Sequence, residues 1–367
     1  MNGTIYMPVG EVCSSISDTY REKKNMVTLI NTSDVLEGRV LNHERVPNSN
    51  LKGQFKKTFQ RDDILYSEIR PQNRRFAYVD FSPIDYVAST KLMVIRAKKD
   101  VVSPKYLYYF LKNSSTVAEL QLLAETRSGT FPQITFSEVA NLTIPVPSLA
   151  VQEVIVQTMQ CLEDKITCNE QINDNLQQQA QAIYSSMFID NSESAWTHGH
   201  LSDLVTVKYG KDHKKLSEGI YPVYGSGGIM RYVERPLYDK ESVLIPRKGT
   251  LNNVMYVNQP FWSVDTMFYT EMKLPNVAKF VYHFVKAKDL ASMNAGSAIP
   301  SMTTDILNAM EVVIPSASAL EEFEALVAPM YEAMEANDVQ SQALSKVRDT
   351  LLPKLMSGEI DVSSVLL

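Results

Sequence analysis

The chain of 367 residues is long enough for two or three domains, and with 44% hydrophobic residues it can build stable cores. It has no basic segment followed by an apolar one near its start, and no run of about 18 apolar residues, so we expect a cytoplasmic protein without a membrane span. Its formal charge of -6 argues at first against a nucleic-acid partner, because binding to phosphates requires Lys and Arg.

The charge is distributed unevenly along the chain. Residues 1–147 and 191–315 carry net charges of +4 and +1, whereas residues 148–190 and 316–367 carry -5 and -6. The acidity therefore belongs to two short segments, and the two longer segments are neutral to mildly basic.

Two runs in the first hundred residues recur loosely in the second half of the chain. DDILYSEIRP (Asp62 to Pro71) resembles KESVLIPRKG (Lys240 to Gly249), and each is a β-rich run that ends in a basic turn. VASTKLMVI (Val87 to Ile95) resembles VDTMFYT (Val264 to Thr270). We therefore expect a related domain in each half.

A stricter repeat follows these runs. PQITFSEVANLTIPVP (Pro132 to Pro147) aligns without gaps on PSMTTDILNAMEVVIP (Pro300 to Pro315), so that Pro132 corresponds to Pro300 and every later residue keeps the same offset. Alternating apolar residues predict a short, half-buried strand at the end of each copy, and each copy leads into a helix.

The first of these helices is expected at about residues 150–188, because apolar or polar-core residues recur there every seven positions. The two rows are Ile155, Leu162, Asn169, Leu176 and Ile183, and Met159, Ile166, Asn173, Ala180 and Met187. The offset of the repeat carries these rows onto a similar seam in residues 316–367, so the helices should pack as an antiparallel coiled coil. Pro329 and Pro353 predict a kink or a break in the second helix.

Asn169 and Asn337 are the midpoints of the two seams. An antiparallel pair would place them face to face, where a buried polar residue fixes the register of the helices at some cost in stability. The alternative is that both asparagines face solvent.

The predicted fold class is α/β (mixed α+β), with two tandem, pseudo-repeated domains and two long antiparallel coiled-coil helices. The domains occupy residues 1–147 and 191–315. A central spacer helix occupies residues 148–190, and a second spacer helix with a tail occupies residues 316–367.

Several motifs resemble those of one known family, the specificity subunits of type I restriction-modification systems. LLPKLMSGEIDVS (Leu351 to Ser363) resembles the C-terminal signature of that family, and FPQIT (Phe131 to Thr135) the segment before its central spacer. YPVYGSGGI (Tyr221 to Ile229) and SVLIPRKGT (Ser242 to Thr250) resemble parts of its target-recognition domains. The resemblance covers essentially the whole chain.

This resemblance implies a DNA-binding protein that catalyses nothing itself. Each target-recognition domain would read one half of a split double-stranded DNA target, and the helices would fix the gap and bind two methyltransferase subunits, with restriction (motor) subunits joining them. The resemblance implies no cofactor in this chain, with S-adenosylmethionine, ATP and Mg on the partner subunits. Since the two domains differ apart from their frame, we expect an asymmetric target.

The candidate DNA-binding residues are mainly the Lys and Arg residues of the two domains, which can bind phosphates and read guanine edges. They are Lys52, Lys56, Lys57, Arg61, Arg70, Arg74 and Arg75 in the first domain, and Lys208, Lys211, Lys214, Lys215, Arg231, Arg247 and Lys248 in the second. For any single residue a solvated surface role is an equal alternative.

Two loops are further candidates. The turn GSGG (Gly225 to Gly228), with Tyr224 and Ser226, could let the backbone approach DNA closely, and it lacks the lysine and spacing of a P-loop. Arg127, Gly129 and Thr130 precede the first copy of the repeat, as Gly296 and Ser297 precede the second, and form either a DNA-contacting loop or only a turn.

Metal binding and catalysis have little support in the sequence. His198 and His200 have no Cys or acidic partner at a metal-site spacing, and Cys13, Cys161 and Cys168 fit a reducing compartment rather than a disulfide framework. A methyltransferase needs a glycine-rich cofactor loop and an Asn or Asp followed by Pro-Pro and an aromatic residue, and neither occurs. A self-contained methylating enzyme is therefore disfavoured.

Apolar residues at the helix ends are the candidate partner-binding surface, because they exceed what a two-helix seam can bury. They are Tyr184, Met187, Phe188, Leu351, Leu352 and Leu355. The alternative is that they pack on their own domains. A further hypothesis for the whole chain is a coiled-coil scaffold that binds no DNA.

Overall fold

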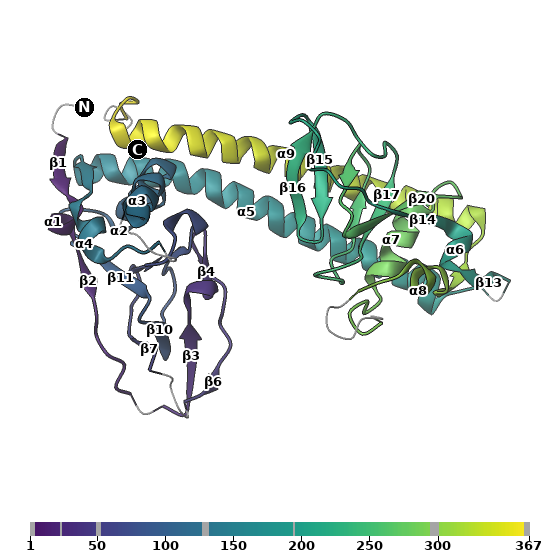
Figure 1. Ribbon diagram of the computed structural model, residues 1–367, viewed down its shortest axis with the longest axis horizontal. Helices are drawn as coiled ribbons and strands as arrows, with labels where there is room; N and C mark the ends of the chain where they lie inside the picture. The colour runs from purple at the N-terminus through teal and green to yellow at the C-terminus, as the bar shows by residue number, and fades with distance from the viewer. Residues whose placement is uncertain are drawn as a thin grey trace. The chain divides into compact units, whose positions relative to one another are not determined.

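The computed structural model describes residues 4–22, 24–48, 53–126, 132–193, 195–293 and 301–362. The chain divides into two compact units: unit 1 comprises Met1–Asn169 and Val339–Leu367, and unit 2 comprises Glu170–Asp338. Two long helices, α5 (Leu149–Ser185) and α9 (Ala317–Ser357), each contribute one part to unit 1 and the other part to unit 2 (Figure 1).

Unit 1 carries its strands in two four-stranded sheets and two short ribbons. The strands are β1 (Ile5–Pro8), β2 (Cys13–Ile16), β3 (Met26–Ile30), β4 (Val35–Leu36), β5 (Arg39–Val40), β6 (Val46–Pro47), β7 (Phe55–Lys57), β8 (Ile64–Ser67), β9 (Phe76–Tyr78), β10 (Tyr86–Ser89), β11 (Leu92–Ala97) and β12 (Thr143–Val146). The short helices are α1 (Val9–Val12), η1 (Thr32–Asp34), η2 (Pro71–Asn73), α2 (Pro104–Lys112), α3 (Ser114–Thr126) and α4 (Phe136–Asn141).

Unit 2 has its strands and short helices in a similar order along the chain to those of unit 1. Its strands are β13 (Thr197–His200), β14 (Val205–Tyr209), β15 (Tyr221–Gly225), β16 (Gly228–Val233), β17 (Ser242–Pro246), β18 (Met255–Val257), β19 (Trp262–Ser263), β20 (Met267–Met272) and β21 (Glu311–Ile314). Its shorter helices are α6 (Leu201–Leu204), α7 (Ala278–Lys286) and α8 (Thr304–Asn308), and a π-helical turn, η3 (Ser186–Asp190), follows α5.

The sheets of the two units share one frame. The sheet β2-β11-β8-β9 of unit 1 corresponds to β14-β20-β17-β18 of unit 2, and the antiparallel ribbon β1-β12 corresponds to β13-β21. The strands expected at the end of each repeat copy are therefore confirmed as β12 and β21. The pairing partners β1 and β13 escaped the sequence comparison.

The repeat also sets the helix starts before these strands. Thr135 begins α4 with a capping box, in which the Glu138 carboxylate accepts hydrogen bonds from the Thr135 N–H and hydroxyl at 2.7 and 2.6 Å. Thr303, at the same repeat position, begins α8, and its hydroxyl accepts a hydrogen bond from the Ile306 N–H. A threonine is thus the N-cap residue of the short helix in both copies of the repeat.

Within each unit the segments of α5 and α9 run antiparallel. In unit 1 the start of α5 shares a core with the end of α9, where Ile155 and Met159 lie in one cluster with Leu352 and Leu355. In unit 2 the end of α5 shares a core with the start of α9, which contains Tyr184 and Phe323. The predicted antiparallel pair is confirmed within each unit.

The seam asparagines lie in polar layers. Asn169 is fully buried and its amide donates hydrogen bonds to Gln340 Oε1 at 2.9 Å and Ser341 Oγ at 3.1 Å. The Asn337 amide donates to Asn173 Oδ1 at 2.8 Å. The solvent-facing alternative is wrong for Asn169. The face-to-face pairing of Asn169 with Asn337 would join residues of the two units, and it stays a prediction.

Of the kink or break expected at Pro329 and Pro353, a break does not occur, because α9 is one helix from Ala317 to Ser357, and a kink stays a prediction. Each proline removes one backbone donor. Val327, two residues before Pro329, and Leu352, next to Pro353, are buried in the cores of their units, and this apolar burial offsets the lost hydrogen bonds.

A short helix joins each domain to the long helices through equivalent residues. The Tyr109 hydroxyl of α2 donates to the Glu163 carboxylate at 2.8 Å. In unit 2 His283 of α7 lies 3.0 Å from the hydroxyl of Tyr331, the residue that the repeat aligns with Glu163. His283 also contacts Gln181 Oε1 at 2.8 Å. At these equivalent positions the partner on the long helix is a carboxylate in unit 1 and a tyrosine in unit 2, where Lys279 of α7 also forms an ion pair with Glu324 of α9 at 2.6 Å.

Candidate nucleic-acid interface

In each unit the basic turn after a buried strand pairs with the start of the repeat segment. In unit 1 the turn follows β8, and Ile69 forms an antiparallel bridge with Gln133. In unit 2 the turn follows β17, and Lys248 forms the same bridge with Ser301. Since Gln133 and Ser301 are aligned by the repeat, these junctions are equivalent. The fold therefore unites two separate predictions, the basic turn and the repeat, at one place in each unit.

These bridges correct the alignment of the two turns. An end-to-end match of the two sequence runs equates Arg70 with Lys248, but the bridges equate Ile69 with Lys248, so Arg70 corresponds to Gly249. Both corresponding residues have left-handed backbone, with φ of 45° and 85°. Both basic turns therefore place a residue in the left-handed region at this position. Glycine adopts that conformation without strain, and arginine does not.

A backbone carbonyl beside each turn accepts a hydrogen bond from a cationic side chain. Lys57 Nζ donates to the Thr90 carbonyl at 3.0 Å and to the Leu92 carbonyl at 2.7 Å. In unit 2 Arg247 Nη1 donates to the Asp265 carbonyl at 3.1 Å. Thr90 and Asp265 stand two residues before the equivalent strands β11 and β20, so they occupy the same place in the frame.

Lys57 is part of the fold of unit 1 rather than a free phosphate ligand. Burial lowers the pKa of its ammonium group, and both hydrogen bonds hold it against the backbone. We expect Lys57→Met to lower the free energy of unfolding of unit 1 by about 1–3 kcal/mol, because two carbonyls lose their donor. Hydrogen exchange of the β11 amides measures this loss. A reduced salt dependence of DNA binding with unchanged exchange would instead assign Lys57 to phosphate contact.

Four other predicted cations are also engaged within their units. Arg74 Nη2 donates to Ser114 Oγ, and Arg75 Nη1 donates to the Ser33 carbonyl, each at 3.0 Å. Arg231 Nη2 donates to the Leu216 carbonyl at 2.9 Å. Lys208 lies 3.7 Å from Glu271, a half-exposed pair that contributes little to stability.

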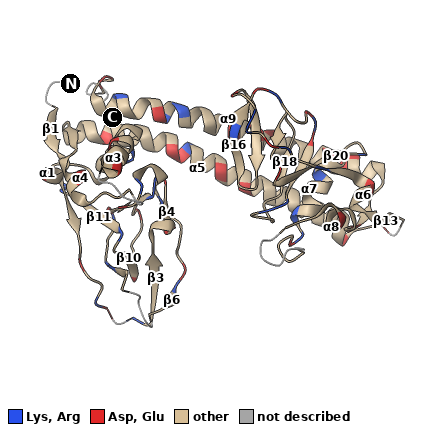
Figure 2. Ribbon diagram, in the orientation of Figure 1, with Lys and Arg blue, Asp and Glu red and all other residues tan. Residues whose placement is uncertain are grey.

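The remaining cations of the prediction are exposed where the structure describes them. They are Lys56, Arg61, Arg70, Lys211, Lys214, Lys215 and Lys248. Figure 2 shows Lys and Arg positions, in blue, on helices, strands and loops of both units. Lys52, Arg127, Gly129 and Thr130, together with Gly296 and Ser297, lie outside the described residues.

The glycine-rich turn 225–228 lies beside the basic turn of unit 2. Asn253 Nδ2 donates to the Ser226 carbonyl at 2.8 Å, and a Cβ on Gly249 would lie 2.7 Å from Ser226 Oγ. Tyr224, in contrast, is a core residue with 9% exposure. Its hydroxyl contacts Gln259, and burial raises its pKa. The prediction that Tyr224 lies on the DNA-facing surface is therefore wrong, because its ring completes the core.

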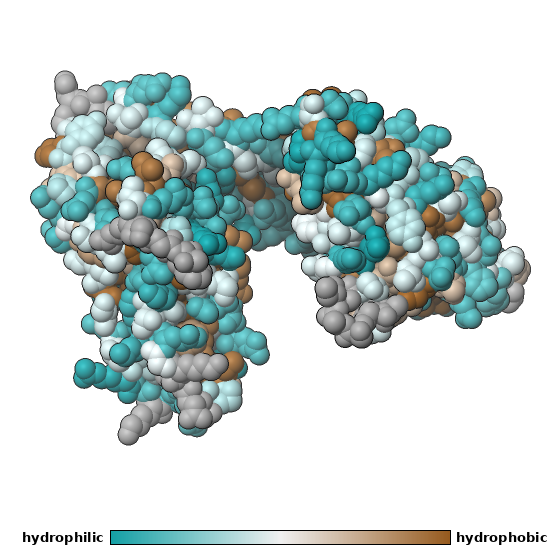
Figure 3. Space-filling model, viewed as in Figure 1, coloured by the Kyte–Doolittle hydropathy of each residue, from teal (hydrophilic) through white to brown (hydrophobic). Residues whose placement is uncertain are grey.

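The six apolar residues proposed for partner binding are not on a free surface. Tyr184 and Phe188 lie in the core of unit 2 with Met187 packed against it, and Leu352 and Leu355 lie in the core of unit 1 with Leu351 packed against it. The alternative, packing on their own domains, is correct, because each domain adds a third apolar face to the seam. The visible surface of each unit is mostly hydrophilic (Figure 3).

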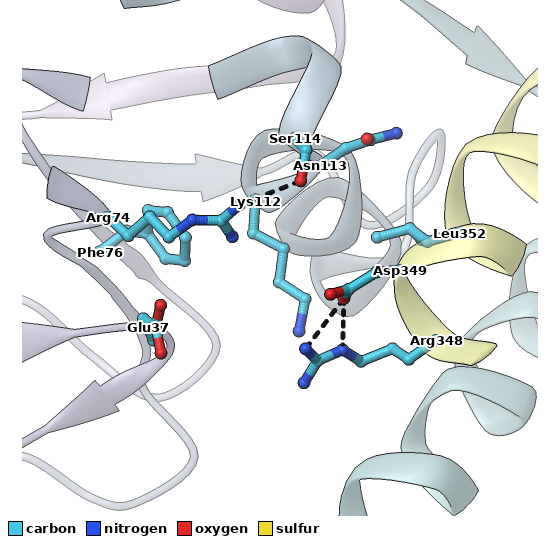
Figure 4. Close-up of a pocket in the computed structure, with 9 residues that line it drawn as sticks. All are labelled: Glu37, Arg74, Phe76, Lys112, Asn113, Ser114, Arg348, Asp349 and Leu352. Atoms are coloured by element: carbon cyan, nitrogen blue, oxygen red, sulfur yellow. Dashed lines mark hydrogen bonds and ion pairs between the residues drawn. The ribbon is translucent and has the colours of Figure 1, made fainter. Parts of the chain in front are cut away.

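A cavity of about 80 Å³ lies in unit 1 between the start of β9, the junction of α2 and α3, and the last turns of α9 (Figure 4). It is lined by Glu37, Arg74, Phe76, Lys112, Asn113, Ser114, Arg348, Asp349 and Leu352. Three of its charged residues are in ion pairs within unit 1: Arg348 with Asp349 at 2.9 Å, and Lys112 with Glu163 of α5. The cavity therefore belongs to the joint between domain and helices.

His198 and His200, the histidines considered as metal ligands, lie at alternate positions of β13, and His200 is the N-cap residue of α6. Within the described part of the chain, no group of three or more His, Cys, Asp or Glu side chains could hold a metal ion. No helix among those residues is long and apolar enough to cross a membrane.

Two features of the site escaped the sequence comparison. KYLYYFLK (Lys105 to Lys112) and KFVYHFVK (Lys279 to Lys286) are equivalent helices with matching apolar positions, which would have revealed the joints. Tyr209, half exposed at 52%, is the last residue of β14 and precedes Gly210 and Lys211. An exposed aromatic residue next to a lysine at a strand end was the available signal.

The duplicated frame, with one basic junction in each copy, defines a class of protein that carries two related recognition domains on one chain. The sequence matches the family described as the type I restriction modification DNA specificity domain over residues 6–178 and 193–322. The chain therefore belongs to this family, and the resemblance noted in its motifs is confirmed.

Individual relatives agree with the assignment. The chain is 27% identical to the type I restriction enzyme HindI specificity subunit of Haemophilus influenzae, over 91% of this chain and 94% of that one. It is 25% identical to the MjaIX specificity subunit of Methanocaldococcus jannaschii, over 77% of each chain. A crystal structure of a type I S subunit from Mycoplasma genitalium has the same fold, with a TM-score of 0.57 at 17% identity over 97% of both chains.

Proposed function

We propose that this chain is the DNA-reading, noncatalytic subunit of a type I restriction-modification complex and binds an asymmetric bipartite target, one half-site per domain. Its partners would be double-stranded DNA, two methyltransferase subunits and restriction subunits. S-adenosylmethionine, ATP and Mg would be bound by those partner subunits.

The observation that carries the proposal is the paired junction of basic turn and repeat segment, which occurs once in each unit. Two copies of one surface on one chain suit a target with two half-sites. The residues at equivalent positions differ, however. Glu68 in unit 1 is paired with Lys91 at 3.4 Å, whereas the corresponding residue in unit 2 is Arg247. Different charges on one frame favour two different half-site sequences.

The test is genome-wide adenine methylation in a host that expresses this chain with its methyltransferase partner. We expect a new split motif with a fixed gap and unlike halves, absent from a strain without the chain. A palindromic motif would contradict the asymmetric target. Unchanged methylation with the complex shown to be assembled would instead favour a scaffold that binds no DNA.

The noncatalytic part of the proposal has its own test. Purified chain incubated with labelled S-adenosylmethionine and target DNA should transfer no label until the methyltransferase subunit is added. Transfer by the chain alone would contradict this part without affecting the bipartite reading of DNA.

A further inference from the structure

Four segments of unit 2 meet around Arg247. The residue after β14 is joined to the start of β20, because the Gly210 N–H donates to the Met267 carbonyl at 3.0 Å. The basic turn is joined to the residue just before β20, because the Arg247 N–H donates to the Thr266 carbonyl at 2.9 Å. The turn is joined to the repeat segment by the Met302 N–H, which donates to the Arg247 carbonyl at 2.9 Å. Backbone hydrogen bonds thus fix the end of β14 and the start of the repeat segment, which lie next to Arg247.

The guanidinium of Arg247 is held in one position while part of it stays accessible. Nη1 donates to the Asp265 carbonyl at 3.1 Å, and the carbon Cζ lies 5.5 Å from the centre of the Tyr209 ring. No other hydrogen bond of this guanidinium is found among the described residues. Arginine has five N–H donors in a planar fork, so an edge of the fork remains for a ligand.

Tyr209 is itself fixed. Its ring packs edge-on against Phe268, a fully buried residue, with ring centres 5.0 Å apart. Gly210 permits the tight bend that follows, since a Cβ there would lie 2.0 Å from the Val264 carbonyl oxygen. The guanidinium of Arg247 therefore contacts both an exposed tyrosine at a fixed strand end and the Asp265 carbonyl.

Unit 1 lacks this arrangement at the equivalent position. Glu68 replaces Arg247 there, and its carboxylate lies 3.4 Å from Lys91 Nζ, which also donates to Gln133 at 3.3 Å. The carbonyl equivalent to that of Asp265 is occupied by Lys57. The forked donor is therefore particular to unit 2, so its effect on recognition should be limited to one half of the target.

We infer that Arg247 reads a guanine in the half-site of unit 2, through two hydrogen bonds to the O6 and N7 atoms, and that Tyr209 is a positioning residue for it. This inference rests on the proposed function. A guanidinium held in one position can donate two parallel hydrogen bonds to the O6 and N7 acceptors of guanine in the major groove. A phosphate can accept the same pair of hydrogen bonds, so the base dependence and the salt dependence of binding are what distinguish the two ligands.

The experiment uses the assembled methyltransferase complex and measures methylation at every single-base variant of the target. For Arg247→Lys we expect one position of one half-site to lose discrimination by about 5- to 150-fold, with the other half-site unchanged. Tyr209→Phe keeps the ring and should behave as the parent protein, whereas Tyr209→Ala should relax the same position in part. Lys286→Gln, which removes an exposed cation of α7 in the same unit, is the matched control and should change nothing.

The outcomes separate this inference from the proposed function. A parent complex without any split motif would overturn the proposed function. A parent complex with a split motif, combined with Arg247→Lys and Arg247→Gln variants of unchanged specificity, would overturn the guanine contact alone. Weaker binding by Arg247→Gln to all sequences equally, with a salt slope reduced by about 1, would assign Arg247 to a phosphate and also overturn the inference.

Discussion

Replacing Arg96 with methionine is expected to lower the free energy of unfolding of unit 1 by about 3–5 kcal/mol, because a buried carboxylate would lose its counter-charge. Asp63 is fully buried. Its two oxygens accept from Arg96 Nε at 2.7 Å and Nη2 at 2.8 Å, and a third hydrogen bond comes from the Gln60 N–H at 2.8 Å. Bidentate geometry at a buried site makes this pair far stronger than a surface ion pair.

A neighbouring pair supplies the control. Lys99 lies 2.6 Å from Asp62, but its side chain is 61% exposed, so Lys99→Met should cost about 0–1 kcal/mol. Hydrogen exchange of β8 and β11 amides reports on unit 1. Both tryptophans, Trp196 and Trp262, belong to unit 2, so their fluorescence should be unaffected in the Arg96 variant. Equal losses in the two variants would contradict the argument.

Acidification from pH 6.5 to pH 4 is expected to destabilise unit 2 by up to about 3 kcal/mol through His283 alone. Burial lowers the pKa of this imidazole to about 4. Because Gln181 Oε1 can only accept, Nδ1 of the neutral ring donates to it and Nε2 accepts from the Tyr331 hydroxyl. The unfolded chain binds a proton below about pH 6.5, while the folded unit does so only near pH 4. The stabilisation is therefore complete above pH 6.5 and is lost as the pH falls to 4.

His283→Gln isolates this contribution from that of the carboxylates, since glutamine can form hydrogen bonds but does not titrate. The denaturation midpoint, followed by tryptophan fluorescence, should fall less steeply with pH in the variant than in the parent. Parallel pH profiles would show that His283 is not the source. Unit 1 has Tyr109 at the equivalent position and should lack this component.

The sequence was sufficient to predict the frame wherever a residue's role depends on its own neighbours in the chain. The repeat of Pro132–Pro147 in Pro300–Pro315 located β12, β21 and the paired long helices, because strand alternation, caps and heptads are local patterns. It could not predict which surface each seam residue meets. Leu352 and Phe188 look surplus to a two-helix seam until the domain that covers them is in place.

The recognition site was predictable in composition but not in detail. The basic turns were found, yet the residue-by-residue correspondence between them was not, since it is set by backbone bridges to a distant segment. Lys57 and Arg75 were indistinguishable from surface cations by sequence, because the carbonyls that bind them lie far away along the chain, at Thr90 and Ser33. The role proposed for Tyr209 depends on its contact with Arg247, which the sequence does not reveal.

The division of the chain also affects the order in which its parts can be completed during synthesis. Unit 2 is continuous, from Glu170 to Asp338, whereas unit 1 combines the segment Met1–Asn169 with the segment Val339–Leu367. Leu352, Leu355 and Met356 fill part of the core of unit 1. The core of unit 1, whose first segment is translated early, therefore stays incomplete until Leu352, Leu355 and Met356 have left the ribosome. Unit 2 can already be folded by then, because its residues are translated before these. A chain shortened by a late stop codon would keep its second recognition domain and leave the core of its first one open to water.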